Sequence, residues 1–424
     1  MNDNIATPFA KPLYVMLKPA GAHCNLACKY CYYLEKNHLY QNTPRHLMTD
    51  EMLEQFTREY IEAQTMPQVL FTWHGGEPLM RSIDFYKKAL ELQKKYAHGK
   101  QIDNVIQTNG TLLTDEWCAF FAQNHFLVGI SIDGPQEYHD HYRQTSAGKP
   151  SWEKVMHGIS LLKKHRVEWN AMAVVNAYNA EHPLEFYHFF RDNGCQYLQF
   201  TPIVERLTEH EDGRTLASLA DVSHEDNYED VGNAKKQKEN QEITIANFSV
   251  TPEQWGKFLC TIFDDWVRHD VGKIFVEIFD CTLANWVGVQ PGICAYSKEC
   301  GHAGVMEHNG DVFSCDHFVF PEYKLGNIQD KSLIDMLYGE KQQAFSRLKH
   351  TSLPRQCKEC DMEFACHGEC PKNRFENDKY GEPGLNYLCK GYYEYYTHVA
   401  PYMDFMKREL QAQRPPANIM NVLK

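Results

Sequence analysis

No stretch of this 424-residue sequence contains the roughly 18 consecutive apolar residues that a helix needs to cross a bilayer. The segment from Met1 to Ala10 also lacks the apolar run of a secretory signal peptide. Basic residues are fewer than acidic residues: the sequence has 43 Lys and Arg and 56 Asp and Glu, which gives a net charge of −13. These absences argue against a membrane span, an export signal and nucleic acid as the main partner, and they predict a cytoplasmic globular protein.

The 15 cysteines are an odd number, which fits a full set of disulfides poorly, and in a reducing compartment cysteines more often bind metals. Cys24, Cys28 and Cys31 stand close together as Cys-x3-Cys-x2-Cys, and no fourth cysteine follows before Cys118. A cubane iron–sulfur cluster has four irons and usually takes four cysteines, so this loop leaves one iron open to another ligand. A structural zinc loop is the alternative, although zinc sites are built from cysteine pairs that close to four ligands.

Strand and helix patterns alternate from residue 12 to residue 202. Six such units predict parallel strands with helical crossovers, arranged either as an open barrel or as a doubly wound sheet. The predicted strands cover residues 12–18, 69–73, 105–108, 127–132, 168–175 and 197–201. The predicted helices cover 49–64, 83–96, a segment opened by Thr114, a segment capped by Ser151, and 184–192.

Polar loops follow the predicted strands at the end where barrels carry their active sites. Residues 74–78, His-Gly-Gly-Glu-Pro, follow the second strand, and their glycines allow the backbone to approach a ligand while Glu77 can hold the loop. Residues 107–110 follow the third strand, and Ser131 begins the loop after the fourth. Arg143 could pair with a carboxylate. Taken alone, these loops also read as ordinary turns.

Cysteines become dense again in the last third of the chain, where eight of them make two sets of four. A β-hairpin predicted over 305–313, with its turn at Asn309 and Gly310, would bring Cys315 beside Cys294 and Cys300. One or two zinc knots are the alternative. The eight cysteines are Cys294, Cys300, Cys315, Cys357, Cys360, Cys366, Cys370 and Cys389. The four cysteines left over are expected to be small buried hydrophobes: Cys118, Cys195, Cys260 and Cys281.

The Cys24 loop, with a tyrosine just before its last cysteine, resembles the signature loop of the radical S-adenosylmethionine (radical SAM) enzymes. In that family SAM chelates the open iron, and an electron from the cluster cleaves SAM to a 5′-deoxyadenosyl radical. The Gly-Gly-Glu-Pro sequence is similar to the family motif whose backbone contacts the SAM amino group. The resemblance favours a partial (β/α)6 TIM-type barrel. It implies SAM contacts by Tyr30, Gly76, Ser131, Arg143 and Val204.

The run Cys-x2-Cys-x5-Cys-x3-Cys from Cys357 to Cys370 resembles the SPASM domain, a C-terminal extension that holds two auxiliary [4Fe–4S] clusters. Spacing alone would pair Cys370 with its neighbours. The resemblance instead implies one cluster on Cys294, Cys300, Cys315 and Cys370, and the other on Cys357, Cys360, Cys366 and Cys389. The predicted domains are a radical SAM barrel (1–230), a polar insert and linking helix (231–290), a SPASM domain (291–395) and a C-terminal helix and tail (396–424).

Asp316 follows Cys315 directly, where the loop would fix its carboxylate as a general base; a solvated turn aspartate is the alternative. The sequence Cys-Asp-His-Phe, together with the polar loops, resembles the anaerobic sulfatase-maturating enzymes over residues 12–395. That family oxidises a Cys or Ser of a sulfatase to Cα-formylglycine (3-oxoalanine). The resemblance implies that the adenosyl radical removes a Cβ hydrogen while Asp316 removes the thiol or hydroxyl proton. Tyr33 matches a tyrosine near the reacting side chain, and a core aromatic is the alternative. His74 stands where glutamine is usual.

The implied partners are a nascent or unfolded sulfatase with a Cys/Ser-x-Pro/Ala-x-Arg motif, and a reducing electron donor such as flavodoxin or ferredoxin. Both Cys-type and Ser-type sulfatases are compatible with these residues. A SPASM enzyme that forms a thioether crosslink in a ribosomal peptide would share every cluster ligand but need not keep Asp316. A non-catalytic zinc protein would require the polar loops to be accidental. Residues 205–247 are expected to form a surface insertion or connection, followed by a helix over 252–269 that Thr251 caps.

Overall fold

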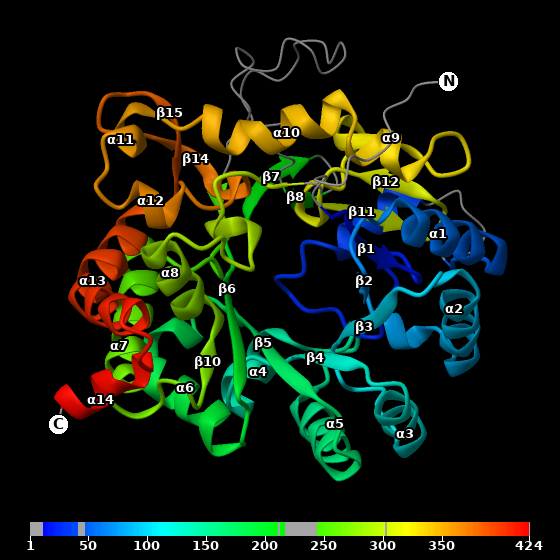
Figure 1. Cartoon of the computed structure of the whole chain (residues 1–424), viewed down its shortest axis with the longest axis horizontal. Coiled ribbons are helices and arrows are strands. Elements are labelled where there is room, and N and C mark those ends of the chain that lie inside the picture. The colour runs from blue at the N-terminus through cyan, green and yellow to red at the C-terminus, as the bar shows by residue number, and fades with distance from the viewer. Residues whose placement is uncertain (1–11, 41–46, 211–212, 217–243, 302, 424) are drawn as a thin grey trace. The chain divides into compact units, whose positions relative to one another are not determined.

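The structure is a computed structural model that describes residues 12–40, 47–210, 213–216, 244–301 and 303–423 (Figure 1). The chain forms two compact units, and each unit is assembled from three separate segments of the sequence. Unit 1 contains residues 1–130, 143–169 and 301–346, and unit 2 contains residues 131–142, 170–300 and 347–424. The predicted division at residues 230, 290 and 395 stays a prediction.

Unit 1 is built on a sheet whose first strands are β1 (Tyr14–Lys18), β2 (Gln68–Trp73), β3 (Gln101–Thr108) and β4 (Leu127–Ser131). These strands pair in parallel in the order β4-β3-β2-β1. Each is followed by a helix, so the expected α/β order is confirmed here. The third strand begins four residues before its predicted start, because Gln101 to Asn104 continue the pairing with β2.

The helices of unit 1 are α1 (Asp50–Ala63), α2 (Ile83–Tyr96), α3 (Asp115–Gln123) and α5 (Trp152–His165). Thr49 and Thr114 cap α1 and α3 as expected, since each side chain accepts a hydrogen bond from a first-turn backbone N–H. The predicted helix start at Ser151 is confirmed, because Ser151 is the N-cap residue of α5. Its hydroxyl donates to the carbonyl of Arg143 at 2.8 Å, however, and makes no cap hydrogen bond to a helical N–H.

A hairpin from the last third of the chain extends the unit 1 sheet. It consists of β11 (Ala303–Glu307) and β12 (Asp311–Phe313), with Gly310 at φ 88° in the turn, so the predicted hairpin is confirmed. β11 also pairs in parallel with β1, with Lys18 opposite Glu307. This pairing was not predicted, and it brings the loop that follows β12 to the end of β1.

The sheet of unit 1 ends with β13 (Lys324–Asn327), which pairs antiparallel with β12. The helices α9 (Leu333–Leu337) and α10 (Glu340–Thr351) follow, and α10 continues into unit 2. Between the sheet and its first helices lies a stack of buried aromatic rings, which includes Phe56, Tyr60, Phe71 and Trp73. This core fixes β2, and therefore the loop that follows it.

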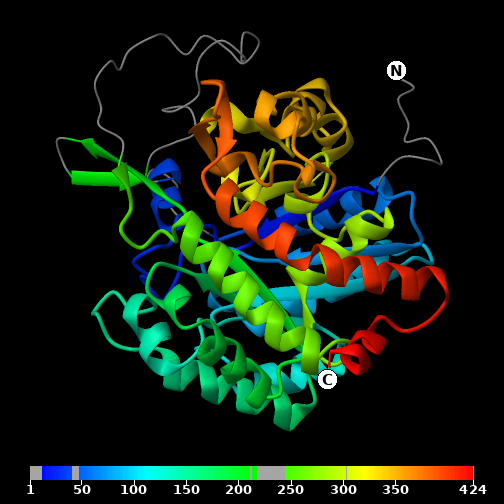
Figure 2. The same cartoon turned by 90° about the vertical axis from the view of Figure 1, so that its left-hand side faces the viewer.

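Unit 2 contains three more strands, β5 (Trp169–Val175), β6 (Tyr197–Pro202) and β10 (Phe275–Val276), which pair in parallel in the order β10-β6-β5. Its helices α7 (Pro252–His269) and α13 (Cys389–Gln411) lie side by side (Figure 2). Gly391 permits this close packing, because a Cβ there would lie 2.1 Å from the carbonyl oxygen of Pro252. Thr251 caps α7 as predicted, in a reciprocal capping box with Gln254.

The remaining elements of unit 2 are short. The charged run that the sequence places at 234–240 lies outside the described residues.

Among the described helices, none is long and apolar enough to span a bilayer. The other helices are α4 (Gln136–Tyr142), α6 (Pro183–Asp192), α8 (Glu277–Val287), α11 (Arg355–Lys358), α12 (Glu363–Cys366) and α14 (Ile419–Val422). The other strands are β7 (Arg206–His210), β8 (Gly213–Leu216), β9 (Thr244–Ile245), β14 (Arg374–Asn377) and β15 (Pro383–Asn386).

Candidate active site

The cysteine loop after β1 is tied to the loop after β2 by backbone hydrogen bonds. Gly76 donates to the carbonyl of Gly21 at 2.8 Å, and Glu77 donates to that of His23 at 2.9 Å. A Cβ at Gly76 would lie 2.3 Å from the His23 carbonyl oxygen, so only glycine fits this approach. The predicted SAM-contacting glycine therefore lies directly against the residue before Cys24.

The Glu77 carboxylate is fully buried and holds the third polar loop. It accepts hydrogen bonds from the Leu79 and Asn109 backbone N–H groups at 2.9 and 2.8 Å and from the Thr108 hydroxyl at 2.7 Å. Burial raises the pKa of Glu77 to about 7 despite these donors. Glu77 thus joins the ends of β2 and β3 below the cysteine loop, which is the role expected from the sequence.

The three thiols of the cysteine loop lie within electrostatic reach of one another. Burial raises the pKa of Cys24, and Glu77, Cys28 and Cys31 add to that rise. Cys24 Sγ also accepts a hydrogen bond from the Asn109 amide at 3.7 Å. In the part of the chain that the structure describes, no group of three His, Cys, Asp or Glu side chains is arranged around a single metal ion. A cubane takes one thiolate per iron, so this half-buried three-thiol set fits a cluster with one open iron.

Asp316 is held between two residues of unit 1. Its Oδ1 forms an ion pair with Lys18 Nζ at 2.5 Å, and its Oδ2 accepts a hydrogen bond from the Tyr32 hydroxyl at 2.5 Å. Burial by itself would raise the pKa of Asp316, but the Lys18 cation, followed by His74 and His317, holds it well below its usual range. The carboxylate is therefore ionised at neutral pH, and it is fixed at both oxygens.

Lys18 is the hub of this group. Its side chain is fully buried at the end of β1, and its ammonium lies 3.1 Å from Nδ1 of His74 and 3.9 Å from the ring centre of Tyr33. Burial and the Lys18 charge lower the pKa of His74 to about 4, so the imidazole is neutral at pH 7. The Gly75 backbone N–H also donates to Nδ1, at 2.8 Å. Nδ1 therefore accepts, and the proton of the neutral ring lies on Nε2.

Tyr33 is buried, and its hydroxyl donates to the Glu307 carboxylate. The ring packs in an apolar cluster with Val305, Phe313 and Val319 from the hairpin segment. Tyr33 is thus a core aromatic whose face contacts the Lys18 ammonium, and it is not hydrogen-bonded to Asp316. The packing agrees with the interpretation of Tyr33 as a core aromatic, and its place near the reacting side chain stays a prediction.

The predicted SAM-binding residues are divided between the units. In unit 1, the Arg143 guanidinium lies 5.6 Å from the ring centre of Tyr30, and its charge lowers the pKa of Cys31 against the larger rise from burial. Ser131 and Val204 belong to unit 2, where Val204 is buried. Tyr30, Gly76 and Arg143 are therefore gathered around the cysteine loop, and the other two assignments stay predictions.

The cysteines of unit 2 fall into two electrostatic groups. The pKa of Cys370 is raised by burial, then by Glu369, Cys300 and Cys294. In the second group, burial raises the pKa of Cys366 and Cys389, and the largest thiol contributions to each come from within the group: Cys389 and Cys357 for Cys366, and Cys357 and Cys360 for Cys389. Cys370 therefore lies nearer to Cys294 and Cys300 than its place in the sequence suggests. Cys315 belongs to unit 1, and its ligation with these residues stays a prediction.

Four cysteines belong to none of the three predicted cluster sites. Cys118, Cys195 and Cys281 are buried, as expected, and Cys260 is half-buried on α7.

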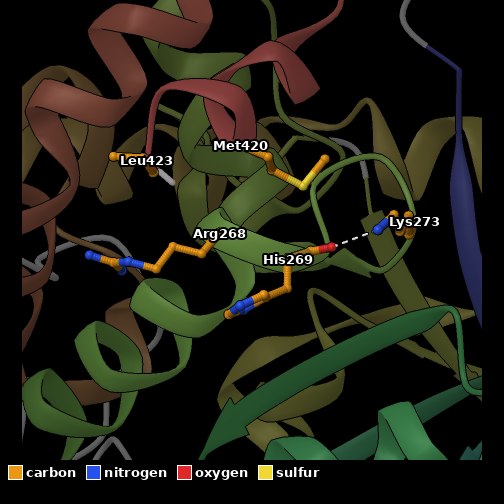
Figure 3. Close-up of a pocket in the computed structure, with 5 residues that line it drawn as sticks. All are labelled: Arg268, His269, Lys273, Met420 and Leu423. Carbon is orange, nitrogen blue, oxygen red and sulfur yellow. Dashed lines mark hydrogen bonds between the residues drawn. The ribbon is translucent and has the colours of Figure 1, made fainter.

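A pocket of about 420 Å³ in unit 2 contains none of the predicted site residues (Figure 3). It is lined by Arg268, His269, Lys273, Met420 and Leu423. Lys273 donates to the His269 carbonyl at 2.9 Å, as the dashed line shows.

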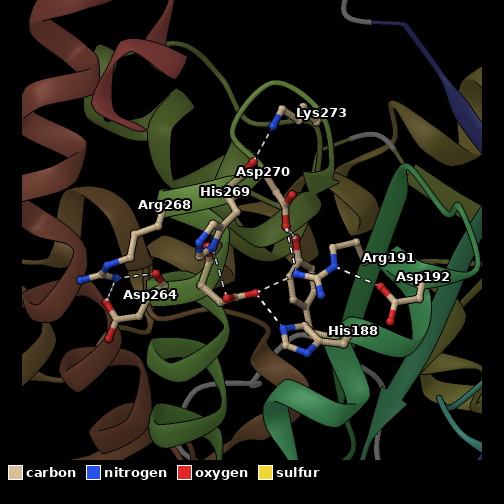
Figure 4. Close-up of polar contacts among 10 residues, drawn as sticks. His188, Arg191, Asp192, Asp264, Arg268, His269, Asp270 and Lys273 are labelled. Carbon is tan, nitrogen blue, oxygen red and sulfur yellow. Dashed lines mark hydrogen bonds and ion pairs between the residues drawn. The ribbon is translucent and has the colours of Figure 1, made fainter. Parts of the chain in front are cut away.

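The cationic residues near this pocket are matched by aspartates (Figure 4). Asp265 pairs with His188 at 2.9 Å and with Arg191 at 3.3 Å, and Arg268 lies 3.5 Å from Asp264. Of the lining residues, Arg268 and His269 therefore have aspartate partners, whereas Lys273 donates to a backbone carbonyl.

Sequence reasoning missed Lys18, Tyr32 and Glu307. The signal for Lys18 was present, because a lysine ends the apolar strand Tyr-Val-Met-Leu-Lys at the edge where the site lies. Tyr32 and Asp316 are 284 positions apart, and no local pattern joins them.

Two family models match the chain. One, described as the radical SAM superfamily, covers residues 19–190, and one, described as an iron-sulfur cluster-binding domain (SPASM), covers residues 299–361. These matches agree with the predicted α/β fold class, a radical SAM barrel with a C-terminal SPASM domain.

Similar proteins align over almost the full length. A serine-type anaerobic sulfatase-maturating enzyme from Bacteroides thetaiotaomicron is 67% identical over 424 residues, which is 100% of this chain and 98% of the relative. A cysteine-type anaerobic sulfatase-maturating enzyme from Clostridium perfringens is 30% identical over 393 residues, with 92% of this chain and 97% of the relative covered. The solved structure of anSMEcpe with bound AdoMet is 30% identical, has a TM-score of 0.78, and covers 94% of this chain and 100% of its own.

Proposed function

The chain belongs to the anaerobic sulfatase-maturating enzymes, a radical SAM family, and from this premise we propose that it oxidises a serine or cysteine of a sulfatase to Cα-formylglycine (3-oxoalanine) with Asp316 as the proton acceptor. The proposal is carried by the position of Asp316, an ionised carboxylate that Lys18 and Tyr32 hold directly after Cys315. The family's cofactors are three [4Fe–4S] clusters and SAM.

When bound, these cofactors supply the 5′-deoxyadenosyl radical that removes the Cβ hydrogen and an acceptor for the electron that the oxidation releases. Cys24, Cys28 and Cys31 would hold the cluster with the open iron. Gly76 and Arg143 would face the SAM amino and carboxylate groups beside Tyr30, and the two auxiliary sets would take the remaining clusters. These assignments are supported by the three-thiol loop, by the close approach at Gly76 and by the grouping of Cys370 with Cys294 and Cys300. The SAM contacts of Ser131 and Val204 stay predictions.

Asp316 can take a proton without a rearrangement of its partners. Each carboxylate oxygen has two acceptor sites, and Lys18 and Tyr32 use one site on each. The Asp316 side chain is 14% exposed whereas that of Lys18 is fully buried, so a bound peptide reaches the carboxylate and not the ammonium. A hydroxyl hydrogen-bonded to Asp316 would lose its proton to Oδ1 or Oδ2 as the carbon is oxidised.

His74 would act beside the target residue as a neutral group. Its Nδ1 is occupied by Lys18 and Gly75, so the side that carries Nε2–H remains for the peptide. Tyr33 would form the floor of the site through its ring, since its hydroxyl is directed to Glu307.

The finer parts of the substrate assignment follow the relatives. The 67% identity to a serine-type enzyme supports serine as the residue oxidised. We expect a Ser-x-Pro/Ala-x-Arg motif, because an arginine suits a protein with a net charge of −13. A nascent sulfatase and a donor such as flavodoxin or ferredoxin would place the reaction in the cytoplasm. Thioether crosslinking of a ribosomal peptide is the alternative, and no observation favours it.

The test uses the reconstituted protein under anaerobic conditions with SAM, a reductant and paired peptides that differ only in Ser or Cys before x-Pro-x-Arg. Mass spectrometry follows the peptide, and chromatography follows 5′-deoxyadenosine. The expected result is loss of two hydrogens from the serine peptide and capture of the new aldehyde by a hydrazide. Formation of 5′-deoxyadenosine with both peptides unchanged would contradict the substrate assignment.

A further inference from the structure

The two cysteine sets of unit 2 have unlike electrostatic surroundings. Lys349, at the end of α10, is fully buried, and its ammonium donates to the carbonyls of Cys294, Ala295 and Ser297, with 2.7 Å to Ala295. An ammonium has three N–H donors, and each has a backbone acceptor here, so the group is held in its charged form without a carboxylate partner. Its charge is therefore not neutralised by an ion pair.

Lys349 lies beside the first set, of which Cys294, Cys300 and Cys370 belong to unit 2. Burial lowers the pKa of Lys349, and the largest contributions that oppose this shift come from Cys300, Cys294, Cys370 and Glu369. The second set comprises Cys357, Cys360, Cys366 and Cys389. Lys349 is thus a buried cation bound to the loop that carries a first-set cysteine.

Arg374 is shared between the sets. Its guanidinium donates to backbone carbonyls of the segment between Cys366 and Cys370, at 2.7 Å to His367 and 2.8 Å to Gly368. Cys366, Cys370 and Cys357 all raise its pKa against the larger lowering by burial. Arg374 therefore adds positive charge to both sets and does not distinguish them.

Acidic side chains lie near both sets, since the buried Glu369 raises the pKa of Cys370 and of Cys294 in the first set. Asp378 and Glu363 raise the pKa of Cys357, after burial and Cys360, and Asp361 and Glu363 raise that of Cys360. A positive charge near an iron–sulfur cluster stabilises its reduced form, and a negative charge stabilises its oxidised form.

We propose that Lys349 is a redox-tuning residue that gives the cluster on the first set a higher reduction potential than the cluster on the second set. The ammonium fixes the loop that carries Cys294 and leaves its positive charge beside the thiolates. The inference rests on the cofactors of the family and not on the sulfatase substrate, so it can fail or succeed independently of the proposed function.

The experiment is redox titration of the holoenzyme, monitored by electron paramagnetic resonance, on the unsubstituted protein and on Lys349→Gln. Glutamine retains N–H donors and removes the charge. We expect the first-set couple to fall by at least a tenfold change in its reduction equilibrium, which is 59 mV for one electron. The second-set couple should stay in place and serves as an internal reference.

Two further variants separate charge from packing. Lys349→Arg keeps the charge and should restore the potential of the first set. Lys257→Met removes an exposed lysine of α7 and should move neither couple. An unchanged first-set couple in folded Lys349→Gln would overturn the proposal, as would equal shifts of both couples.

A second measurement covers the case in which Lys349→Gln does not fold. Cys357→Ser keeps an oxygen ligand in the second set and should move that couple, which identifies it in a protein that retains Lys349. Addition of SAM identifies the couple of the Cys24 cluster, because SAM binds its open iron. The remaining couple that stays must then lie at the higher potential. If it lies at the lower potential, Lys349 does not set the order and the proposal is wrong.

Discussion

Two fully buried lysines, one in each unit, have different partners. Lys18 in unit 1 contacts side chains that can change their protonation state, Asp316 and His74. Lys349 in unit 2 donates its hydrogen bonds to three backbone carbonyls, which cannot titrate. The charge of Lys18 is offset by the carboxylate of Asp316, and the ion pair fixes the position of that carboxylate, the proposed proton acceptor. A lysine held by carbonyls has no carboxylate to offset its charge, and the side chains beside Lys349 are cysteines of the first set.

The largest expected effect comes from removing the reactive partner of Lys18. Asp316→Asn keeps the shape of the side chain but cannot accept the substrate proton, so aldehyde formation should fall by about 10²- to 10⁴-fold. The ratio of aldehyde to 5′-deoxyadenosine measures this loss, because radical formation does not require Asp316. A variant that retained the original ratio would show that Asp316 is not the proton acceptor.

The next largest effect is on stability, and it tests the ion pair between Lys18 and Asp316. Lys18→Met leaves the buried Asp316 carboxylate without its cation, which should destabilise the protein by about 3–5 kcal/mol. The double variant Lys18→Met with Asp316→Asn should recover part of this loss, because no uncompensated charge remains. Denaturant unfolding of the three variants gives the coupling energy. Additive losses would contradict the ion pair as the main contribution of Lys18.

A third prediction compares Asp316 with Glu77, a buried carboxylate of unit 1 that has neutral donors and no cation. Its pKa is raised from 4.5 to about 7, so the folded state binds this proton more tightly than the unfolded chain does. Stability should therefore fall as pH rises from 4.5 to 7, by about 3 kcal/mol, and this contribution should be constant above 7.

Unfolding of Glu77→Gln across this pH range should lack that slope. Glu253→Gln, which removes an exposed carboxylate paired with Lys390, should keep it. A slope that persists in Glu77→Gln would assign the pH dependence to another group.

The smallest expected effect is on turnover, when the hydrogen bond from Tyr32 to Asp316 is removed. Tyr32→Phe removes one hydrogen bond to a charged group while the Lys18 ion pair stays, so turnover should fall by about tenfold with little change in stability. Tyr380→Phe, which removes an exposed hydroxyl that donates to Glu359, is the matched control and should have no effect on turnover. Equal turnover in the two variants would show that Tyr32 does not orient Asp316.

Much of the fold could be predicted because its signals are local. Thr49, Thr114 and Thr251 mark helix starts through side chains that bond the next turn, and the Asn309-Gly310 pair marks a hairpin. Ser151 also marks a helix start, but its hydroxyl bonds a nearby alternative acceptor, the carbonyl of Arg143, that local sequence does not reveal.

The site was only partly predictable because its centre depends on pairing between distant segments. The parallel pairing of β11 with β1 places Glu307 opposite Lys18 and brings Asp316 to the same place. No periodicity in either strand specifies its partner. The cysteine motifs and the Gly-Gly-Glu-Pro loop could be identified from the sequence, because their functional residues are close together in the chain. Lys18 and Tyr32 could not, because they contact Asp316 only in the folded protein.

The most direct test of the central claim uses a serine peptide with deuterium at both Cβ positions, incubated anaerobically with the holoenzyme, SAM and reductant. If the protein oxidises serine through hydrogen abstraction at Cβ, deuterium should appear in 5′-deoxyadenosine in proportion to the aldehyde formed. Deuterium-free 5′-deoxyadenosine together with an unchanged peptide would contradict the account.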